Sequence, residues 1–382
     1  MKYHIIFILL VLLSCRNEKK SFDPGLLAVV ILANTYSWDL PVGFPHPNVP
    51  QDNPMSVAKV KLGRFLFYDK KLSLNQTQSC ASCHRQEIAF TDGLAVSVGS
   101  TGELHPRNSQ HLSNVAYNSV FTWGNPILDS LEKQAPGPMF GTTPVELGLA
   151  DREQVLIDRL SGDKDYRQMF ADAFGSEKEI NVTNIVKAIA SFQRTLLSGN
   201  SAYDKYRNGT DKKAMSASAI RGMNLFFGER AECFHCHNGF NLADTVSHAG
   251  AASEVVFHNT GLYNVAGTDS YPTGNQGIFE ATSRAEDKGK FRAPSLRNVE
   301  LTAPYFHDGS AATLYDVVDG YMAGGRNITT GPHAGDGRAN KLKDPLVRSF
   351  SLTPTEREDL VNFLRSLTDR EFVENPAFAS PF

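Results

Sequence analysis

The sequence lacks an excess of charge of either sign. In its 382 residues, 38 Lys and Arg side chains stand against 41 Asp and Glu, a formal net charge of −3. Chains that bind nucleic acid usually concentrate positive charge, so this balance predicts no nucleic acid partner. Hydrophobic residues at 41% and charged residues at 21% are typical of a globular protein.

A long hydrophobic run is also missing. The marked apolar stretch, residues 5–13, follows Lys2 and ends just before Ser14 and Cys15. It is too short to span a membrane and is typical of an export signal. Residues 12–15 resemble the end of a bacterial lipoprotein signal, in which Cys15 becomes the lipidated first residue; the alternative is an ordinary signal peptide. We therefore expect a lipoprotein-type signal peptide over 1–15 and a periplasmic protein attached to the membrane only through a lipid on Cys15.

Cysteine is scarce, with five residues in the whole chain. Four of them form two C-x-x-C-H motifs, Cys80 to His84 and Cys233 to His237. This motif attaches a c-type haem: the thiols bind the porphyrin and the histidine ligates the iron. A redox dithiol or a chance disulfide does not need the histidine, a zinc site needs both pairs together, and none of these predicts the motif twice. The chain therefore predicts two covalently bound c-type haems, attached through Cys80, Cys83, Cys233 and Cys236 and ligated by His84 and His237.

Sustained alternation of apolar and polar residues is absent, which leaves helices as the main regular structure. We expect a helix from about Met55 that contains Gly63, packed against a helix over 184–197. A helix containing Gly222 precedes the second motif and is expected to pack against 353–367. Because glycine inside a helix costs about 1 kcal/mol relative to alanine, its use at matching places predicts two close helix crossings.

The length fits two domains with insertions. Residues 16–50 are polar and rich in proline and predict a tether or wrapping segment. The polar stretch 198–211 contains glycine and marks the expected boundary. We therefore predict a mostly α fold of two cytochrome c-like haem domains with long loops, the first over 51–205 and the second over 206–382.

Several short segments, taken in order, resemble the bacterial di-haem cytochrome c peroxidases and their MauG-like relatives. They are Ala89 to Gly93, Pro106 to Asn108, Phe121 to Gly124, Pro144 to Gly148, Pro294 to Asn298 and Leu301 to Gly309. The resemblance covers nearly all of the mature length. It implies that the N-terminal haem reacts with hydrogen peroxide and that the C-terminal haem transfers electrons.

The resemblance also implies residues that act at the first haem. Glu146 matches the family's active-site glutamate, which moves a proton between the two peroxide oxygens, although by itself it could be a helix-start residue. Trp123 matches the tryptophan that relays oxidising equivalents between the haems, although by itself it could be a core residue. In peroxidases that need reductive activation, a distal histidine follows V-S-V/I-G; here Ser100 takes that place, which implies an open iron. His105 is either a substitute ligand or a loop histidine.

The second haem needs another axial ligand, and the resemblance places it on the helix after 301–309. Counting along the chain gives Tyr321, with Met322 the alternative one position later. A phenolate stabilises oxidised iron, whereas a thioether raises the reduction potential. The resemblance further implies a calcium ion held by the side chain of Asn108 and the carbonyl oxygens of Thr302 and Pro304, since calcium prefers oxygen ligands.

The sequence thus predicts an exported enzyme that oxidises a partner with hydrogen peroxide. Segments 121–126 and 139–148 look most like the di-haem enzymes of methanobactin-type operons, which oxidise a tryptophan on a partner protein. One alternative is a peroxidase that takes electrons from a small cytochrome or cupredoxin, which ligation by Met322 would favour. A second alternative is a non-catalytic electron carrier with two six-coordinate haems.

Overall fold

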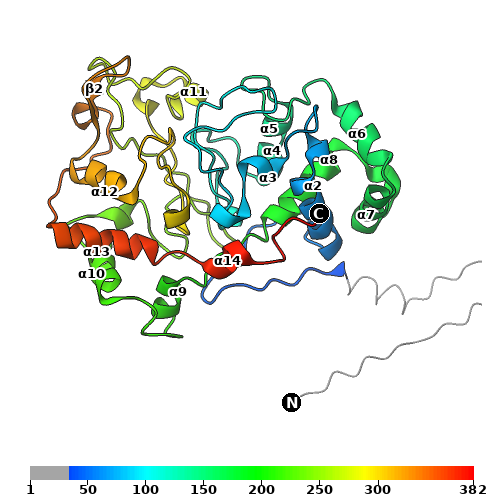
Figure 1. The fold of residues 1–382 in the computed structure, drawn as a ribbon, viewed down its shortest axis with the longest axis horizontal. Helices are drawn as coiled ribbons and strands as arrows, with labels where there is room; N and C mark the ends of the chain where they lie inside the picture. Colours follow the sequence, from blue (N-terminus) through cyan, green and yellow to red (C-terminus); the bar gives the residue numbers. More distant parts are fainter. Residues whose placement is uncertain (1–33) are drawn as a thin grey trace, which may run out of the picture. The chain divides into compact units, whose positions relative to one another are not determined.

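Helices form nearly all the regular structure of the protein in the computed structural model, which describes residues 34–382 (Figure 1). The strands of this described part are one antiparallel pair, β1 (Asn327–Ile328) with β2 (Gly335–Asp336), in which Asn327 pairs with Asp336. The expectation of a mostly α fold is therefore confirmed. Within the same residues no helix is long and apolar enough to cross a bilayer. The signal peptide expected over 1–15, Cys15 included, lies outside the described residues.

The first helix crossing brings α2 (Val57–Tyr68) against α8 (Val182–Gln193). Ser56 and Asn181 cap the two helices, because their side-chain oxygens accept hydrogen bonds from backbone N–H groups in the first turn. A Cβ atom on Gly63 would lie 1.9 Å from the carbonyl oxygen of Ala188. Glycine is thus required for this approach, as the sequence predicts.

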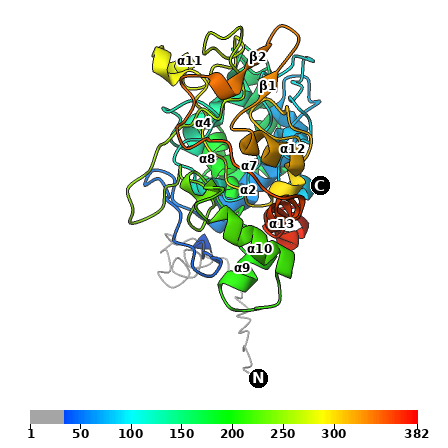
Figure 2. The same ribbon diagram turned by 90° about the vertical axis from the view of Figure 1, so that its left-hand side faces the viewer.

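The second crossing repeats the arrangement with α10 (Ala217–Phe226) and α13 (Pro354–Arg365), which lie side by side in Figures 1 and 2. A Cβ atom on Gly222 would lie 1.9 Å from the carbonyl oxygen of Asp359. Thr353 and Glu356 form a reciprocal capping box at the start of α13. Both predicted crossings are confirmed.

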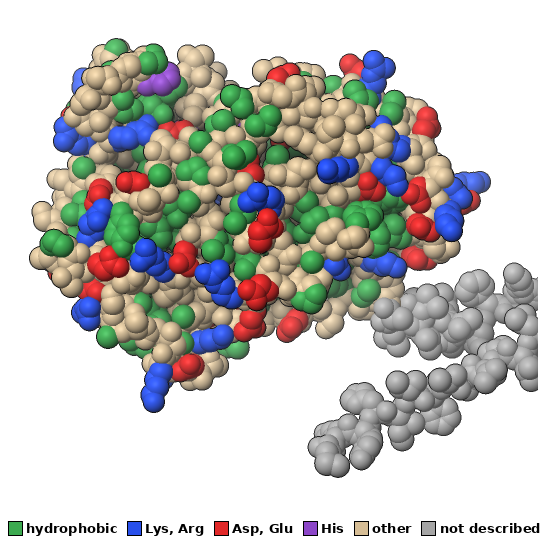
Figure 3. All heavy atoms as spheres, in the orientation of Figure 1, with side chains coloured by type: hydrophobic (Ala, Val, Ile, Leu, Met, Phe, Trp, Pro, Cys, Tyr) green, Lys and Arg blue, Asp and Glu red, His purple; other side chains and the backbone are tan. Residues whose placement is uncertain are grey.

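The remaining helices are shorter than α2, and two long segments, 84–130 and 238–313, are mostly irregular, with helical stretches of at most four residues, α11 among them. These helices are α3 (Cys80–Cys83), α4 (Leu131–Gln134), α5 (Pro136–Phe140), α6 (Glu153–Ser161), α7 (Lys164–Phe174), α9 (Ala202–Arg207), α11 (Phe279–Thr282), α12 (Leu314–Met322) and α14 (Arg370–Glu374). On the face drawn in Figure 3, acidic and basic side chains are interspersed.

Two main hydrophobic cores fill the molecule, one around α2 and α8 and the other around α10 and α13. The end of the chain returns to the first core: Phe372 and Phe378 pack there, and the C-terminus lies beside α2 in Figure 1. Residues 36–382 accordingly form one compact unit.

A buried carboxylate holds the junction between the two cores. One oxygen of Asp369 accepts hydrogen bonds from the hydroxyl of Ser198 at 3.1 Å and from the backbone N–H groups of Gly199 and Asn200 at 3.0 and 2.9 Å. Asn298 adds a second set, because its amide donates to the Ser198 hydroxyl and its oxygen accepts from the Asp369 N–H. These bonds fix the stretch that the sequence marks as a boundary to the segment that precedes α14.

Candidate active site

The first C-x-x-C-H motif forms one wall of a cavity. Cys80 and Cys83 lie on α3 as free thiols, and with His84 they line a space of about 710 Å³. The Nδ1 atom of His84 lies 2.8 Å from the carbonyl oxygen of Phe90. Since only a protonated Nδ1 can donate to a carbonyl, neutral His84 has its lone pair on Nε2.

The second motif has the same arrangement at a larger cavity. Cys233, Cys236 and His237 line a space of about 1660 Å³, and both thiols are free. The Nδ1 atom of His237 lies 3.3 Å from the carbonyl oxygen of Leu242. Burial lowers the pKa of His237, as it does that of His84, which keeps both imidazoles neutral and able to bind a metal.

These features fit a c-type haem at each motif. A histidine whose Nδ1–H is held by a carbonyl, with Nε2 free, is the usual form of a metal-ligating imidazole. The two cysteine pairs line different cavities, so a zinc site shared by all four thiols is excluded.

A buried cation lies at the second cavity. Arg292 is only 4% exposed and lines this space. Its guanidinium contacts uncharged groups, the side chains of Gln110 and Asn118 and the carbonyl of Thr122. Burial lowers the pKa of Arg292 to about 10, so it remains a cation that needs a negative partner. A haem propionate would meet that need.

Glu146 lines the first cavity, as Glu103 does, and its side chain is about one third exposed. Burial raises the pKa of Glu146 from 4.5 to about 7. The segment 144–147 is pressed against the loop after Val98, because the N–H of Ser100 donates to the carbonyl oxygen of Glu146 at 2.8 Å. This packing turns the carboxylate toward the cavity of the first motif.

His105 reaches the same cavity, where its Nε2 lies 3.8 Å from Oε1 of Glu146. The chain reverses direction in a short turn before His105. Val98 forms an antiparallel β-bridge with Leu104, and the N–H of His105 donates to the carbonyl oxygen of Ser97 at 2.8 Å. His105 thus lies in a loop, and this loop brings its imidazole to the cavity of the first motif. The signal was in the sequence: the polar, glycine-containing run of residues 99–103 between the apolar residues Val98 and Leu104 is typical of a hairpin turn.

Trp123 lies at the second cavity and not at the first. Its indole N–H donates to the carbonyl oxygen of Asn108 at 2.8 Å, and its ring lies 6.5 Å from that of His307. Asn108 in turn binds His307, because its N–H donates to the carbonyl oxygen of that residue at 2.8 Å. The three residues named as calcium ligands, Asn108, Thr302 and Pro304, all line this cavity too.

The two alternatives for the axial ligand are the last two residues of α12, Tyr321 and Met322. Their surroundings differ. Tyr321 lines the second cavity together with Cys233, Cys236 and His237. Met322 packs against the core of α10 and α13 and does not line that cavity. Of the two side chains, the geometry thus presents the tyrosine to the second motif.

Comparison with known proteins supplies the family. The family model for di-haem cytochrome c peroxidase matches residues 57–212. The methylamine utilization protein MauG of Methylorubrum extorquens is 34% identical over 86% of this chain and 82% of its own, and a cytochrome-c peroxidase of Denitromonas iodatirespirans is 38% identical over 87% of each. The chain belongs to the di-haem cytochrome c peroxidase family.

A solved structure of this family is especially similar to the present chain. It is a MauG-like protein associated with microbial copper homeostasis, 49% identical, with a TM-score of 0.88 over 91% of this chain and 99% of its own. As a di-haem cytochrome c peroxidase relative, the protein is a peroxide-dependent oxidoreductase, and the family implies two haems. The alternative of a non-catalytic electron carrier is therefore set aside.

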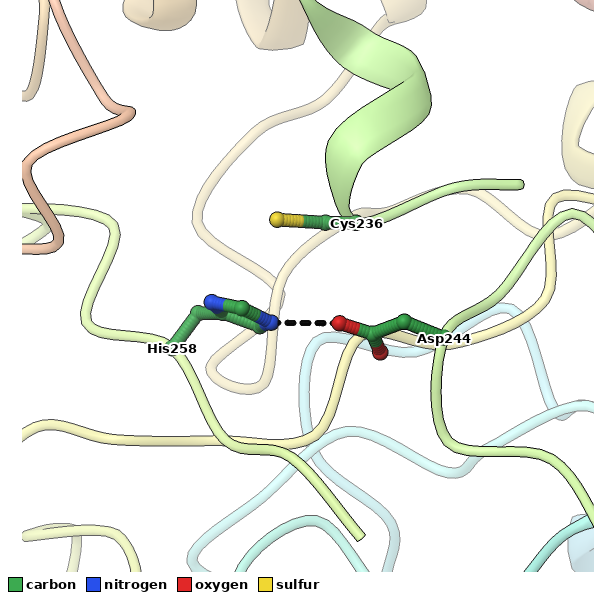
Figure 4. Close-up of side chains that lie close together, drawn as sticks. All are labelled: Cys236, Asp244 and His258. Atoms are coloured by element: carbon green, nitrogen blue, oxygen red, sulfur yellow. Dashed lines mark hydrogen bonds and ion pairs between the residues drawn. The ribbon is translucent and has the colours of Figure 1, made fainter. Parts of the chain in front are cut away.

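One group beside the second motif of this di-haem peroxidase relative resembles a metal site. Cys236, Asp244 and His258 bring their ligand atoms within 4.8 Å of one another (Figure 4). However, His258 uses both nitrogens, with Nε2 2.6 Å from Asp244 and Nδ1 2.6 Å from Asp344. Burial alone would lower the pKa of His258, but the hydrogen bonds to both carboxylates raise it to about 12. The ring is thus an imidazolium without a free lone pair, and it ties three loops together next to the second motif.

Proposed function

We propose that this protein is an exported enzyme that uses hydrogen peroxide to oxidise a partner protein, with a tryptophan side chain as the target. The observation that carries the proposal is that Tyr321 lines the cavity of the second motif, whereas Met322 is partly buried against the core of α10 and α13 and does not line that cavity. Tyr321 would thus hold the second haem through a phenolate, a ligand that stabilises oxidised iron, whereas a methionine thioether would raise the reduction potential. The extensive likeness to a MauG-like protein supports the same conclusion.

The two haems, when bound, supply the redox chemistry for cleavage of the peroxide bond and for electron transfer. Cys80, Cys83 and His84 would hold the first haem. The second would be held by Cys233, Cys236, His237 and Tyr321, with Arg292 beside a propionate. Each half of the chain, 51–205 and 206–382, would then be one cytochrome c-like haem domain.

Proton movement at the first cavity is assigned to Glu146. Its pKa of about 7 lets the carboxylate take a proton from one peroxide oxygen and deliver it to the leaving oxygen at neutral pH. His105 is suited to exchange protons with it, because its Nε2 lies 3.8 Å from Oε1 of Glu146. Its Nδ1 lies within hydrogen-bond distance of both the carbonyl oxygen and the N–H of Arg107, at 3.0 and 3.1 Å.

Three further assignments complete the proposal. Trp123, held by the carbonyl of Asn108, would relay oxidising equivalents between the two haems. The side chain of Asn108 and the carbonyls of Thr302 and Pro304 would bind calcium beside it. Cys15 would carry the lipid that attaches the exported protein to the membrane.

The test is to mix the holoprotein, hydrogen peroxide and candidate exported proteins, and to search by mass spectrometry for oxygen added to a partner tryptophan. The chain offers a matched pair of variants, because Trp38 packs edge-on against Tyr36 at 5.0 Å and lines neither cavity. Trp123→Phe should slow the modification, and Trp38→Phe should not.

A different result would favour the second candidate function. Relatives of up to 38% identity are named cytochrome-c peroxidases, which makes a small cytochrome or cupredoxin the alternative electron source. Rapid peroxide-dependent oxidation of reduced cytochrome c, with no partner tryptophan modified, would replace the proposed function by that peroxidase activity.

A further inference from the structure

Aromatic side chains connect Trp123 with two tyrosines, Tyr263 and Tyr271. His307 is the centre of an aromatic cluster: Phe291 stacks on it with ring centroids 3.7 Å apart, and the rings of Trp123, Tyr263 and Tyr271 lie 6.5, 6.5 and 6.1 Å from it. Tyr263 and Tyr271 also contact each other edge to face at 5.3 Å. The centroids of neighbouring rings in this cluster therefore lie between 3.7 and 6.5 Å apart.

The two tyrosines differ in what their hydroxyl groups face. Tyr263 donates its hydrogen bond to Oδ2 of Asp308 at 2.6 Å. Tyr271 donates to the amide oxygen of Asn259 at 2.7 Å, and an amide cannot take up a proton near neutral pH. Of the two tyrosines, only Tyr263 therefore donates its hydrogen bond to a group that can accept the phenol proton.

The base is held in its charged form. Arg326 lies 3.3 Å from Oδ2 of Asp308, and the N–H of Ser310 donates to Oδ1 at 3.1 Å. Burial opposes ionisation of Asp308, but its neighbours, foremost His307 and Ser310, hold the pKa below its ordinary value. Burial and the nearby carboxylate raise the pKa of Tyr263 to about 12, so the phenol keeps its proton until it is oxidised.

We propose that Tyr263 is an exit for oxidising equivalents, with Asp308 as its proton acceptor. In this step the cation radical of Trp123 takes one electron from Tyr263. The O–H bond of Tyr263 breaks, its proton forms a new O–H bond on Oδ2 of Asp308, and the products are neutral Trp123, a neutral tyrosyl radical and a neutral carboxylic acid. Hydrogen peroxide supplies the oxidising equivalents, since its reduction to two waters consumes two electrons and two protons.

Tyr263 lies one side chain beneath the surface. The guanidinium of Arg326, on a side chain that is 25% exposed, covers its ring at 4.4 Å, and the exposed His333 contacts the ring edge-on at 6.0 Å. His333 lies on the turn between β1 and β2, which in Figures 1 and 2 is far from α10 and α13. A protein docked over Arg326 and His333 would thus come close to the radical.

The experiment uses freeze-quenched electron paramagnetic resonance of the diferric holoprotein after peroxide addition. Protein grown with ring-deuterated tyrosine identifies a tyrosyl signal by its narrowed hyperfine structure. We expect the signal to fall to background in Tyr263→Phe and to be strongly reduced in Asp308→Asn, which removes the base but keeps the size. Tyr271→Phe is the matched control, because it removes a phenol of the same cluster without a carboxylate partner, and it should keep the signal.

The inference rests on the peroxide reaction of the proposed function but not on the identity of the partner. The same samples distinguish a failure of the proposed function from a failure of the role assigned to Tyr263. A tyrosyl signal that persists in Tyr263→Phe, or that is lost equally in Tyr271→Phe, would overturn the role of Tyr263 alone, provided that peroxide still changes the haem absorption. No absorption change on peroxide addition to any sample would overturn the proposed function and this inference together. Unchanged haem absorption of the resting variants verifies that they are folded.

Discussion

At the scale of single residues, the environment of Glu146 determines how the peroxide reaction should depend on pH. Burial raises its pKa to about 7, and the base that takes the peroxide proton is the carboxylate. The rate of peroxide reaction should therefore rise with pH through about 7, as measured by stopped-flow absorption. Glu146→Gln should lose this rise and about 10²- to 10⁴-fold in rate.

The control is Glu87→Gln, a change of the same chemistry near the first motif. Glu87 is 69% exposed and forms an ion pair with Arg85 at the surface. Its variant should keep both the rate and the pH profile. A wild-type rate that does not change with pH would contradict the assignment of Glu146 as the base.

A second prediction at this scale concerns the axial ligand of the second haem. Because Tyr321 lines the cavity and Met322 does not, Tyr321→Phe should change the absorption and paramagnetic resonance spectra of that haem in the resting protein. Met322→Leu keeps a side chain of similar size and should leave both spectra unchanged. The reverse pattern would assign the methionine as ligand and favour the peroxidase alternative.

At the scale of elements, both helix crossings depend on the absence of a side chain. A Cβ atom at Gly63 or Gly222 would meet a backbone carbonyl at 1.9 Å, and a backbone cannot move aside as a side chain can. We expect Gly63→Ala and Gly222→Ala each to lower the free energy of unfolding by roughly 1–3 kcal/mol in denaturant titration.

Gly320, inside α12, gives the matched comparison, since nothing lies within 4 Å of the position its Cβ would take. Alanine is the better helix former by about 1 kcal/mol, so Gly320→Ala should be neutral or stabilising. Equal losses at all three positions would show that the crossings do not depend on close contact.

The helices that cross were predictable because their signals are local. Glycine spacing, apolar periodicity and the capping box of Thr353 with Glu356 all lie within a few residues of the element they define. The surroundings of His258 have no such signal, because Asp344 is brought to it by tertiary packing between distant loops. The position of His105 was intermediate: the turn that carries it is visible in the sequence, but the cavity it enters is made by segment 144–147.

At the scale of the whole molecule, the C-terminal segment stabilises the half of the protein that begins the chain. Phe372 and Phe378 are buried in the first core, and Arg64 on α2 donates a hydrogen bond to the carbonyl of Ala379 at 2.6 Å. Removal of residues 370–382 should therefore destabilise the first core by at least about 3 kcal/mol, the cost of losing one buried phenylalanine. The midpoint temperature of thermal unfolding and the haem content at the first motif should both decrease.

Removal of only the last two residues is the control, because Phe382 is 72% exposed. That variant should unfold close to the wild-type temperature. A full truncation with unchanged stability would mean that the terminal segment packs on the first core without supporting it. This return of the chain could not be predicted from the sequence, because the apolar residues of 370–378 are compatible with packing on either core.

The hydrogen bonds that Asp369 and Asn298 make at the junction have a kinetic consequence. Because they anchor both sides of the boundary, the tunnelling distance between the redox centres should stay constant through each turnover. Electron exchange between them should then be insensitive to solvent viscosity, in contrast to carriers whose domains must swing together before each transfer.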